Sequence, residues 1–246
     1  MCLRLDCVRG GGRRTVLALA ILFGLTASIG ASAEEFPRPD EQGTVEVSLR
    51  PSHTLIVFLS GDGGWWGDID AQLANRFASE GYAVVGIDTQ IWFGPERTAA
   101  EVGAHLSDLA DQYAARVHAT KLVLVGYSYG ADAIPLALHE GAAVFKPVLA
   151  AIVLIAPARV TALQVTLLEQ MDIEPGDIDL LPAQASLSRS ATVCVYGEDE
   201  ASDSGCTDDA LKGVQMITLP GGHHFDEDVK DLGDKISAAI HARAMP

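Results

Sequence analysis

The sequence predicts an α/β fold with a mostly parallel central sheet and helices on both of its faces. Short apolar runs typical of buried strands alternate with longer segments whose apolar residues recur every three or four positions. Helical connections between successive strands favour parallel pairing, because the chain must cross one face of the sheet before the next strand begins. The 246 residues, 48% of them hydrophobic, are enough for a single domain with a sizeable core.

The expected elements follow this alternation along the chain. The first strand alternates apolar and polar residues and is predicted to be half buried, whereas the second is a continuous apolar run typical of a central strand. The helices show apolar residues at helical spacing. Strands are expected at residues 44–49, 54–59, 82–87, 122–125, 148–155, 191–196 and 215–219. Helices are expected at 69–79, 98–118 and 229–243, and a further helix through Ala133, Leu136 and Ala137.

Residues 160–189 interrupt the alternation. They contain a short amphipathic stretch, an acidic turn at 174–179 and the sequence Leu180-Leu181-Pro182. An insertion at the edge where the strands end is a common position for a lid. A crossover helix with an elaborated loop fits the segment equally well, and both interpretations stay open here.

The first 33 residues have the organisation of a cleavable secretory signal peptide. Four arginines precede an apolar run over 16–29, and Ala31-Ser32-Ala33 follows it. The run is short for a membrane span, although an uncleaved anchor is the competing interpretation. We therefore expect a signal peptide at 1–33, a polar linker at 34–43 and one folded domain at 44–246.

Removal of the signal peptide would leave a strongly acidic protein. Without the four Arg and one Asp of that segment, 13 of the 17 basic and 32 of the 33 acidic residues remain, a net charge of −19. Such a surface repels nucleic acid and anionic lipid, so we expect no nucleic-acid partner. Acidity also keeps an exported protein soluble, which requires no cationic partner.

Two of the four cysteines, Cys194 and Cys206, remain after residue 33. An even pair in an exported protein predicts a disulfide. The bond would close a loop of about a dozen residues and contribute about 3 kcal/mol in the chain-entropy model. Two free buried thiols are the alternative.

The candidate nucleophile is Ser128, in the segment Gly126-Tyr127-Ser128-Tyr129-Gly130. An apolar strand leads into this G-x-S-x-G pattern and a helical segment leaves it, which is the layout of a nucleophile elbow. The Ser128 hydroxyl would lie at a helix N-terminus, where the helix dipole favours developing negative charge. The five-residue pattern alone is common, and a glycine-rich turn of another α/β fold is the alternative.

The candidate general base is His223, in the segment Gly221-Gly222-His223-His224-Phe225 just after the last expected strand. We expect it to work near its ordinary pKa of ~6.5. His224 would then pack or hydrogen-bond behind it. A metal site at the histidine pair is the alternative, but no nearby Cys or third His supports it, and we expect no metal and no cofactor.

The acid that orients the base should follow the strand at 191–196. Gly197 is followed there by Glu198, Asp199 and Glu200, and a carboxylate at this place would hold one imidazole tautomer. The sequence does not choose cleanly between Asp199 and Glu200, and we favour Asp199 slightly. The predicted disulfide would brace the same loop.

The oxyanion hole should combine two backbone N–H groups. One is that of Tyr129, directly after the candidate nucleophile. The other would come from the loop Ser60-Gly61-Asp62-Gly63-Gly64-Trp65, in which we favour Asp62. This loop lacks the Gly-Lys-Ser/Thr ending of a phosphate-binding loop.

Taken together, the segments Ser60-Gly61-Asp62-Gly63-Gly64-Trp65, Gly126-Tyr127-Ser128-Tyr129-Gly130-Ala131-Asp132 and Gly221-Gly222-His223-His224-Phe225-Asp226 resemble the VirJ/AcvB family. Members of this family are exported α/β-hydrolase proteins of Gram-negative bacteria. AcvB-type members carry an additional N-terminal domain, and this chain is similar to the shorter VirJ type. The resemblance therefore implies an α/β-hydrolase fold.

The resemblance also implies a periplasmic serine hydrolase that removes the aminoacyl group, typically lysyl, from aminoacyl-phosphatidylglycerol. Its substrate would be an aminoacylated phospholipid at the membrane surface. A link to virulence and type IV secretion is implied as well, with secretion-system proteins as partners. We expect a monomer.

The ammonium groups of such a substrate would need counter-charge near the nucleophile. Asp132, one helical turn after Ser128, could supply it together with Asp62 and Asp68. Asp132 could instead pair with a buried backbone group or an arginine. Two other functions also fit the sequence, a generic periplasmic esterase or thioesterase and a non-catalytic secretion accessory that keeps the fold as a binding scaffold.

Overall fold

The computed structural model describes residues 36–66, 69–166 and 176–244. The signal peptide at 1–33 lies outside them and stays a prediction. Residues 36–43, within the predicted linker, form neither helix nor strand. Asp40 Oδ1 accepts hydrogen bonds from the backbone amides of Gln42 and Thr44, both at 2.8 Å, and this turn leads directly into the first strand.

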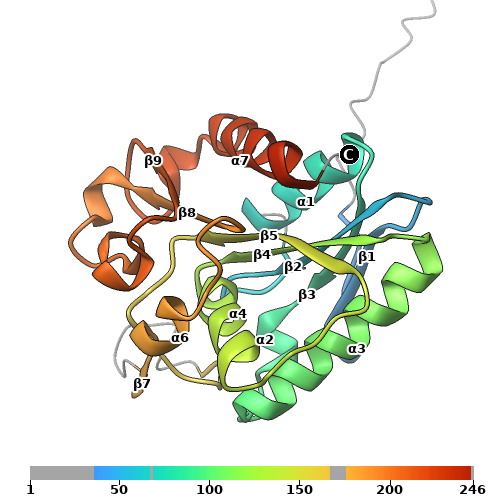
Figure 1. The fold of residues 1–246 in the computed structure, drawn as a ribbon, viewed down its shortest axis with the longest axis horizontal. Helices are drawn as coiled ribbons and strands as arrows, with labels where there is room; N and C mark the ends of the chain where they lie inside the picture. The colour runs from blue at the N-terminus through green and yellow to red at the C-terminus, as the bar shows by residue number, and fades with distance from the viewer. Residues whose placement is uncertain (1–35, 67–68, 167–175, 245–246) are drawn as a thin grey trace, which may run out of the picture. The chain divides into compact units, whose positions relative to one another are not determined.

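A seven-stranded sheet forms the centre of the fold, in the order β1-β3-β2-β4-β5-β8-β9 (Figure 1). Every neighbouring pair is parallel except β1 with β3, which confirms the predicted mostly parallel sheet. The sequence did not indicate the antiparallel first strand. The strands are β1 (Thr44–Ser48), β2 (Thr54–Leu59), β3 (Ala83–Ile87), β4 (Lys121–Tyr127), β5 (Val148–Ile155), β8 (Thr192–Gly197) and β9 (Gln215–Leu219).

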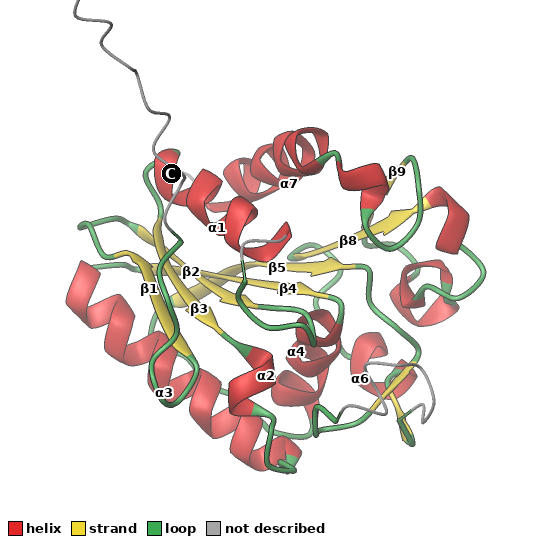
Figure 2. Cartoon of the chain, turned by 180° about the vertical axis from the view of Figure 1, so that it is seen from behind, coloured by secondary structure: helices red, strands yellow, loops and turns green. Residues whose placement is uncertain are grey.

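Helices cover both faces of this sheet, as the two opposite views in Figures 1 and 2 show. One face is covered by α1 (Ile69–Ser79) and α7 (Val229–Ala244). The other is covered by α2 (Thr89–Trp92), α3 (Ala99–Val117), α4 (Tyr129–His139) and α6 (Leu181–Ala185).

Strand β2 is apolar from Leu55 to Leu59 because both of its faces are buried. Successive side chains of a strand point to opposite faces of the sheet. Leu55, Val57 and Leu59 therefore pack into the core beneath α3 and α4, whereas Ile56 and Phe58 pack into the core beneath α1 and α7. All five are buried, so a polar side chain at any of these positions would lose its hydration, because neither face of the strand is exposed to solvent.

Helix α3 begins and ends at the residues that its sequence predicts. Thr98 Oγ1 accepts from the Glu101 amide at 3.2 Å, and Glu101 Oε2 accepts from the Thr98 amide at 2.8 Å. This reciprocal capping box satisfies two donors that the first helical turn leaves unpaired. At the other end His118 has a left-handed conformation with φ of 62° and terminates the helix.

The segment 160–189 leaves the sheet after β5 and returns at β8. Its two ends pair as a short antiparallel ribbon of β6 (Val160–Thr161) and β7 (Ile178–Asp179), and α6 follows. Residues 167–175 lie outside the described residues, so the predicted lid or crossover is described at its ends alone. Within the described ranges, no helix is both long enough and apolar enough to span a membrane.

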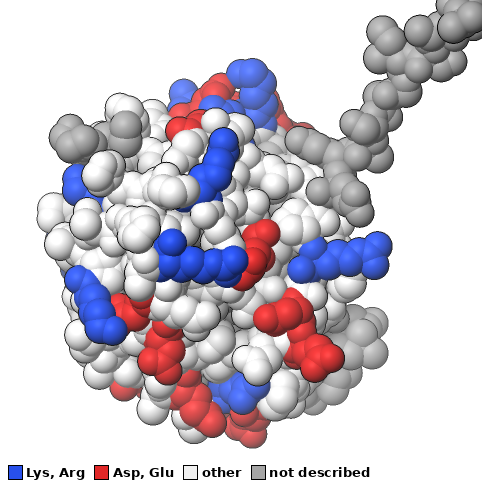
Figure 3. Space-filling model, turned by 90° about the vertical axis from the view of Figure 1, so that its right-hand side faces the viewer, with Lys and Arg blue, Asp and Glu red and all other residues white. Residues whose placement is uncertain are grey.

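The surface is not uniformly acidic. On the face shown in Figure 3, Lys and Arg side chains are interspersed with Asp and Glu, in spite of the large acidic excess of the sequence. Electrostatic effects on ligands therefore depend on local groups as well as on net charge.

Candidate active site

The parallel strands bring several loops to one edge of the sheet. The carboxyl ends of β2, β4, β8 and β9 point the same way, and the loops that follow them contain the residues singled out in the sequence. In open α/β sheets this edge is where ligands bind.

Ser128 lies in a tight turn between β4 and α4. Its φ and ψ of 52° and −121° are unusual for a residue with a side chain, and they lift the hydroxyl out of the end of the strand. A Cβ on Gly126 would collide with the backbone of Gly130. A Cβ on Gly130 would collide in turn with the carbonyl oxygens of Leu59 and Ser60 at the end of β2. The pattern G-x-S-x-G is therefore required by backbone contacts on both sides of the serine.

His223 reaches Ser128 from the loop after β9. Its Nε2 lies 2.8 Å from Ser128 Oγ, within hydrogen-bond distance. The ring is tilted against that of Tyr127, with centroids 5.6 Å apart, which limits its rotation. A neutral imidazole with its proton on Nδ1 can accept the serine proton at Nε2.

The carboxylate beside His223 belongs to Glu200, so the slight preference for Asp199 was wrong. Glu200 Oε2 lies 2.9 Å from His223 Nδ1. The reason is the short 3₁₀ turn η1 (Glu198–Glu200), in which Glu200 turns inward and also accepts from the Gly197 amide at 3.3 Å. Asp199 is exposed, and its backbone amide bonds to the Gly221 carbonyl at 3.0 Å.

The pKa of His223 is raised above its ordinary value, contrary to our expectation. The hydrogen bond that His223 donates to Glu200 is the largest cause, since it stabilises the charged imidazolium; burial acts in the opposite direction. The carboxyl groups of Asp132 and Asp62 add to the increase. His223 therefore becomes the neutral base at a higher pH than an isolated histidine.

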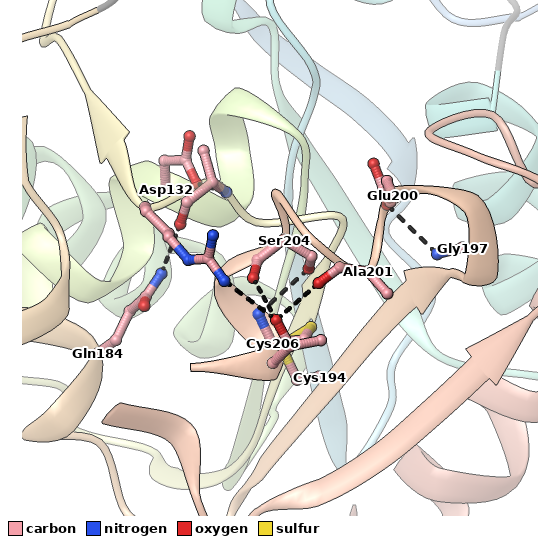
Figure 4. Close-up of a disulfide and its surroundings, with 11 residues drawn as sticks. Asp132, Gln184, Cys194, Gly197, Glu200, Ala201, Ser204 and Cys206 are labelled. Carbon is pink, nitrogen blue, oxygen red and sulfur yellow. Dashed lines mark hydrogen bonds between the residues drawn. A yellow bond between two sulfur atoms is a disulfide. The ribbon is translucent and has the colours of Figure 1, made fainter. Parts of the chain in front are cut away.

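The disulfide between Cys194 and Cys206 is present and braces the Glu200 loop. Cys194 lies on β8 and Cys206 on the short turn η2 (Gly205–Thr207). Between them, the Ser204 amide donates to the Glu200 carbonyl at 2.9 Å. Figure 4 shows Glu200 and its bond to Gly197 beyond the turn that carries Ser204. The covalent link fixes the far end of the loop that presents the carboxylate.

His224 lies beside His223, in the position expected for a supporting residue. Its Nδ1 is 3.0 Å from the Tyr127 hydroxyl, which also lies 3.2 Å from the His223 carbonyl oxygen. The hydroxyl can donate to that carbonyl while accepting from Nδ1–H of His224. This arrangement ties the histidine loop to the residue before Ser128.

Two buried carboxylates hold the loop after β2. Asp88 Oδ2 accepts from the Trp65 amide at 3.0 Å, and its Oδ1 accepts from the Ile91 amide at 3.0 Å. Asp70 Oδ1 accepts from the Gly61 amide at 3.3 Å. Neither carboxylate was among the residues predicted from the sequence, although Asp88 is an acid directly after a buried strand and before a short helix.

The two residues predicted to supply the oxyanion N–H groups both lie near the serine. Tyr129, the first residue of α4, follows Ser128 directly, and Asp62 lines the same cavity as Ser128. Because α4 begins at Tyr129, the Ser128 hydroxyl lies at the N-terminus of a helix, where a developing negative charge would be stabilised.

Asp132 is buried and does not line the cavity, so it is not placed to contact a substrate as predicted; it has instead the buried backbone partner that was the alternative. Its carboxyl group is only 5% exposed, and Oδ1 accepts from the Ala158 amide at 2.8 Å. Gln184 Nε2 donates to the Ala158 carbonyl at 2.9 Å. The amide and the carbonyl of Ala158, which lines the cavity, therefore both have hydrogen-bond partners. Burial raises the pKa of Asp132 to about 8. Asp68 lies outside the described residues.

The cavity around Ser128 has a volume of about 700 Å³. Four carboxylates line it, those of Asp62, Asp70, Glu200 and Asp203, and no Lys or Arg is among its described lining residues. Within the described ranges, no group of three His, Cys, Asp or Glu side chains is arranged to hold a metal ion. The site therefore contains a hydrogen-bonded serine, histidine and carboxylate in a cavity lined by acidic residues.

The sequence matches the family of the bacterial virulence protein VirJ over residues 53–244. This match covers most of the chain and all four loops of the candidate site. The chain belongs to the VirJ family. The resemblance inferred from the three motifs is thus confirmed. Comparison with curated proteins found no significant match.

Solved structures with the same fold include several esterases. A lipase-esterase related protein from Clostridium acetobutylicum has a TM-score of 0.56 at 14% identity, covering 80% of this chain and 98% of that chain. The Pyrococcus furiosus esterase Pf2001 has a TM-score of 0.52 at 15% identity, with coverages of 82% and 87%. Est1E from Butyrivibrio proteoclasticus, solved with ferulic acid, has a TM-score of 0.54 at 13% identity, with coverages of 80% and 94%. At these identities the VirJ-family chain shares the α/β-hydrolase fold with them.

Replacing Glu200 should reduce ester hydrolysis and change its pH profile. Glu200→Gln removes the anion that raises the pKa of His223, so the acidic limb of the residual activity should move to lower pH. We expect kcat to fall by roughly 10³- to 10⁴-fold, as when the triad acid of a serine protease is neutralised. The measurement is the pH dependence of kcat for a short aryl ester.

Asp199→Asn is the matched control for this experiment. It changes an exposed carboxylate one position away and should leave both the rate and the pH profile close to those of the wild type. Loss of activity in Asp199→Asn with full activity in Glu200→Gln would contradict the assignment.

Asp132 should make the stability of the protein fall as the pH rises. Its folded pKa of about 8 lies above the unfolded value near ~3.9, so the folded state binds the extra proton. The stabilisation is complete below pH ~4 and is lost progressively as the pH rises to about 8. Asp132→Asn keeps an oxygen acceptor for Ala158 and cannot titrate. Urea unfolding at pH 5 and pH 8 should show the variant gaining stability relative to wild type at the higher pH, whereas a pH-independent difference would contradict this. Asp199→Asn serves again as the exposed control.

Proposed function

We propose that this VirJ-family protein is a serine hydrolase that removes the aminoacyl group from aminoacyl-phosphatidylglycerol. The observation that carries the proposal is the hydrogen-bonded chain from Ser128 Oγ through His223 to Glu200, with distances of 2.8 and 2.9 Å. Such a chain is the arrangement that activates a serine hydroxyl for acyl transfer. It lies at the carboxyl edge of the sheet beside a cavity large enough for a headgroup.

In the first half of the reaction, Ser128 Oγ attacks the aminoacyl carbonyl carbon while His223 Nε2 takes its proton. Glu200 holds the Nδ1–H of His223 and stabilises the imidazolium that forms. The amides of Tyr129 and Asp62 stabilise the negative charge on the carbonyl oxygen. When the ester C–O bond breaks, His223 returns its proton to the glycerol oxygen, and phosphatidylglycerol leaves.

In the second half, a water molecule replaces the lipid. His223 takes a proton from the water, whose oxygen attacks the acyl-serine carbonyl carbon. Collapse of this intermediate breaks the bond to Ser128 Oγ, which regains its proton from His223. The products are the free amino acid and the regenerated enzyme.

The acidic cavity supports a cationic acyl group as substrate. An α-aminoacyl ester carries one ammonium group beside its carbonyl, and a lysyl ester carries two. Asp62 and Asp203 line the cavity together with Ser128, and each could lie near such a group. Opposite charges attract more strongly in a partly dehydrated cavity than in bulk water. Asp62 then has the role that was expected of it from the sequence, and Asp203 takes the place of Asp132.

We place the protein in the periplasm, where its substrate would be exposed on the membrane. The predicted signal peptide supports this location, and a buried disulfide is compatible with an oxidising compartment. Membership of a virulence-protein family supports a link to secretion, with secretion-system proteins as partners. The enzymatic reaction requires no such partner.

The function is tested by combining lipid analysis with a purified assay. A strain carrying Ser128→Ala in place of the wild type should accumulate aminoacyl-phosphatidylglycerol, and purified wild-type protein should release amino acid from that lipid. Hydrolysis of a short aryl ester without any action on the lipid would favour a generic esterase. Unchanged lipids together with no hydrolysis of either substrate would favour a non-catalytic accessory.

A further inference from the structure

The described lining of the cavity offers few apolar side chains to a fatty acyl chain. Four carboxylates, two histidines and three glycines make up most of the described lining, and the apolar contribution comes from Trp66, Tyr127 and Ala158. Hydrocarbon chains are stabilised by apolar walls, and the carboxylates of this cavity would lose hydration against them. If the substrate is the lipid proposed above, the cavity accepts its polar headgroup and leaves the chains outside.

Trp66 lies where it could contact the membrane that contains the fatty acyl chains. Its side chain is 68% exposed at the cavity mouth, whereas the other two tryptophans of the sequence, Trp65 and Trp92, are 2% and 8% exposed. Its only polar contact among those described is long, with Nε1 at 3.5 Å from Gln90 Oε1. Exposure of an indole to water is unfavourable, whereas tryptophan side chains are enriched where proteins meet the membrane interface.

The neighbouring residue explains why Trp66 points outward. The Trp65 amide is held by Asp88 at 3.0 Å, and its ring packs edge-on against Phe58 with centroids 5.7 Å apart. Gly86 leaves room for this ring, because a Cβ there would collide with it. With Trp65 fixed in the core, the chain presents the next indole on the surface beside Ser128.

We propose that Trp66 is a membrane contact of this enzyme and that the substrate lipid stays in its bilayer during catalysis. The indole would enter the headgroup region, while the aminoacyl group of one lipid enters the acidic cavity. This proposal rests on the proposed function and adds how the protein meets its substrate. Net negative charge disfavours an anionic membrane surface, so attraction comes from the indole and from the ammonium groups of the substrate.

The same charges favour release after the reaction. Hydrolysis converts a headgroup bearing ammonium groups into anionic phosphatidylglycerol, which the acidic cavity repels. Contact with the membrane is then reduced to the single indole.

The test compares two substrates and two exposed apolar side chains. One substrate is lysyl-phosphatidylglycerol in phosphatidylcholine vesicles, and the other is a water-soluble lysine ester. Trp66→Ala should lower the ratio of the vesicle rate to the soluble-ester rate by about tenfold or more. Val148→Ala is the matched control, because Val148 is also 68% exposed but begins β5 at the opposite edge of the sheet. It should leave the ratio unchanged.

Fluorescence gives a second measurement that does not depend on the folding of the alanine variant. Brominated phosphatidylcholine in the same vesicles should quench the tryptophan emission of the Ser128→Ala protein, and Trp66→Phe should remove that quenching, because the other two tryptophans are buried. An unchanged ratio in Trp66→Ala, or the absence of quenching, would overturn the membrane contact. Failure of the wild type to hydrolyse lysyl-phosphatidylglycerol in detergent micelles as well as in vesicles would instead overturn the proposed function.

Discussion

The candidate site depends on backbone segments that approach more closely than side chains would allow. Gly130 lets the start of α4 lie against the end of β2, and this contact brings Ser128 to the loop that contains Asp62. Gly197 does the same between the loops after β8 and β9, since a Cβ there would collide with the Gly222 carbonyl. The close contact at Gly197 brings the loops of Glu200 and His223 together, and the close contact at Gly130 places Ser128 beside the loop after β2.

Carboxylates at this edge of the sheet serve two different purposes. Asp88 and Asp132 are buried and accept hydrogen bonds from loop amides, so they set the shape of the cavity wall. Glu200 is partly exposed and bonds to His223, so it sets the charge state of the base. The hydrogen-bond partners of a carboxylate therefore show whether it holds a loop or contacts the candidate base, and the net charge of the sequence does not.

The sequence predicted the elements well because the parts of parallel strands that are buried on both faces must be apolar, as 55–59 of β2 and 151–155 of β5 are. It also predicted Ser128 and His223, whose motifs each lie at the end of a strand. It could not choose Glu200 over Asp199, because one step along a 3₁₀ turn decides which side chain points inward. The burial of Asp132 was equally hidden, since it depends on Ala158, 26 positions away in the chain.

The central claim is that the arrangement around Ser128 activates its hydroxyl. The most direct measurement is the reaction of the purified protein with a fluorophosphonate probe, followed by mass spectrometry of its peptides. The account predicts one adduct, on Ser128, that is lost in His223→Ala. A correctly folded wild-type protein that gives no adduct on Ser128 would contradict it.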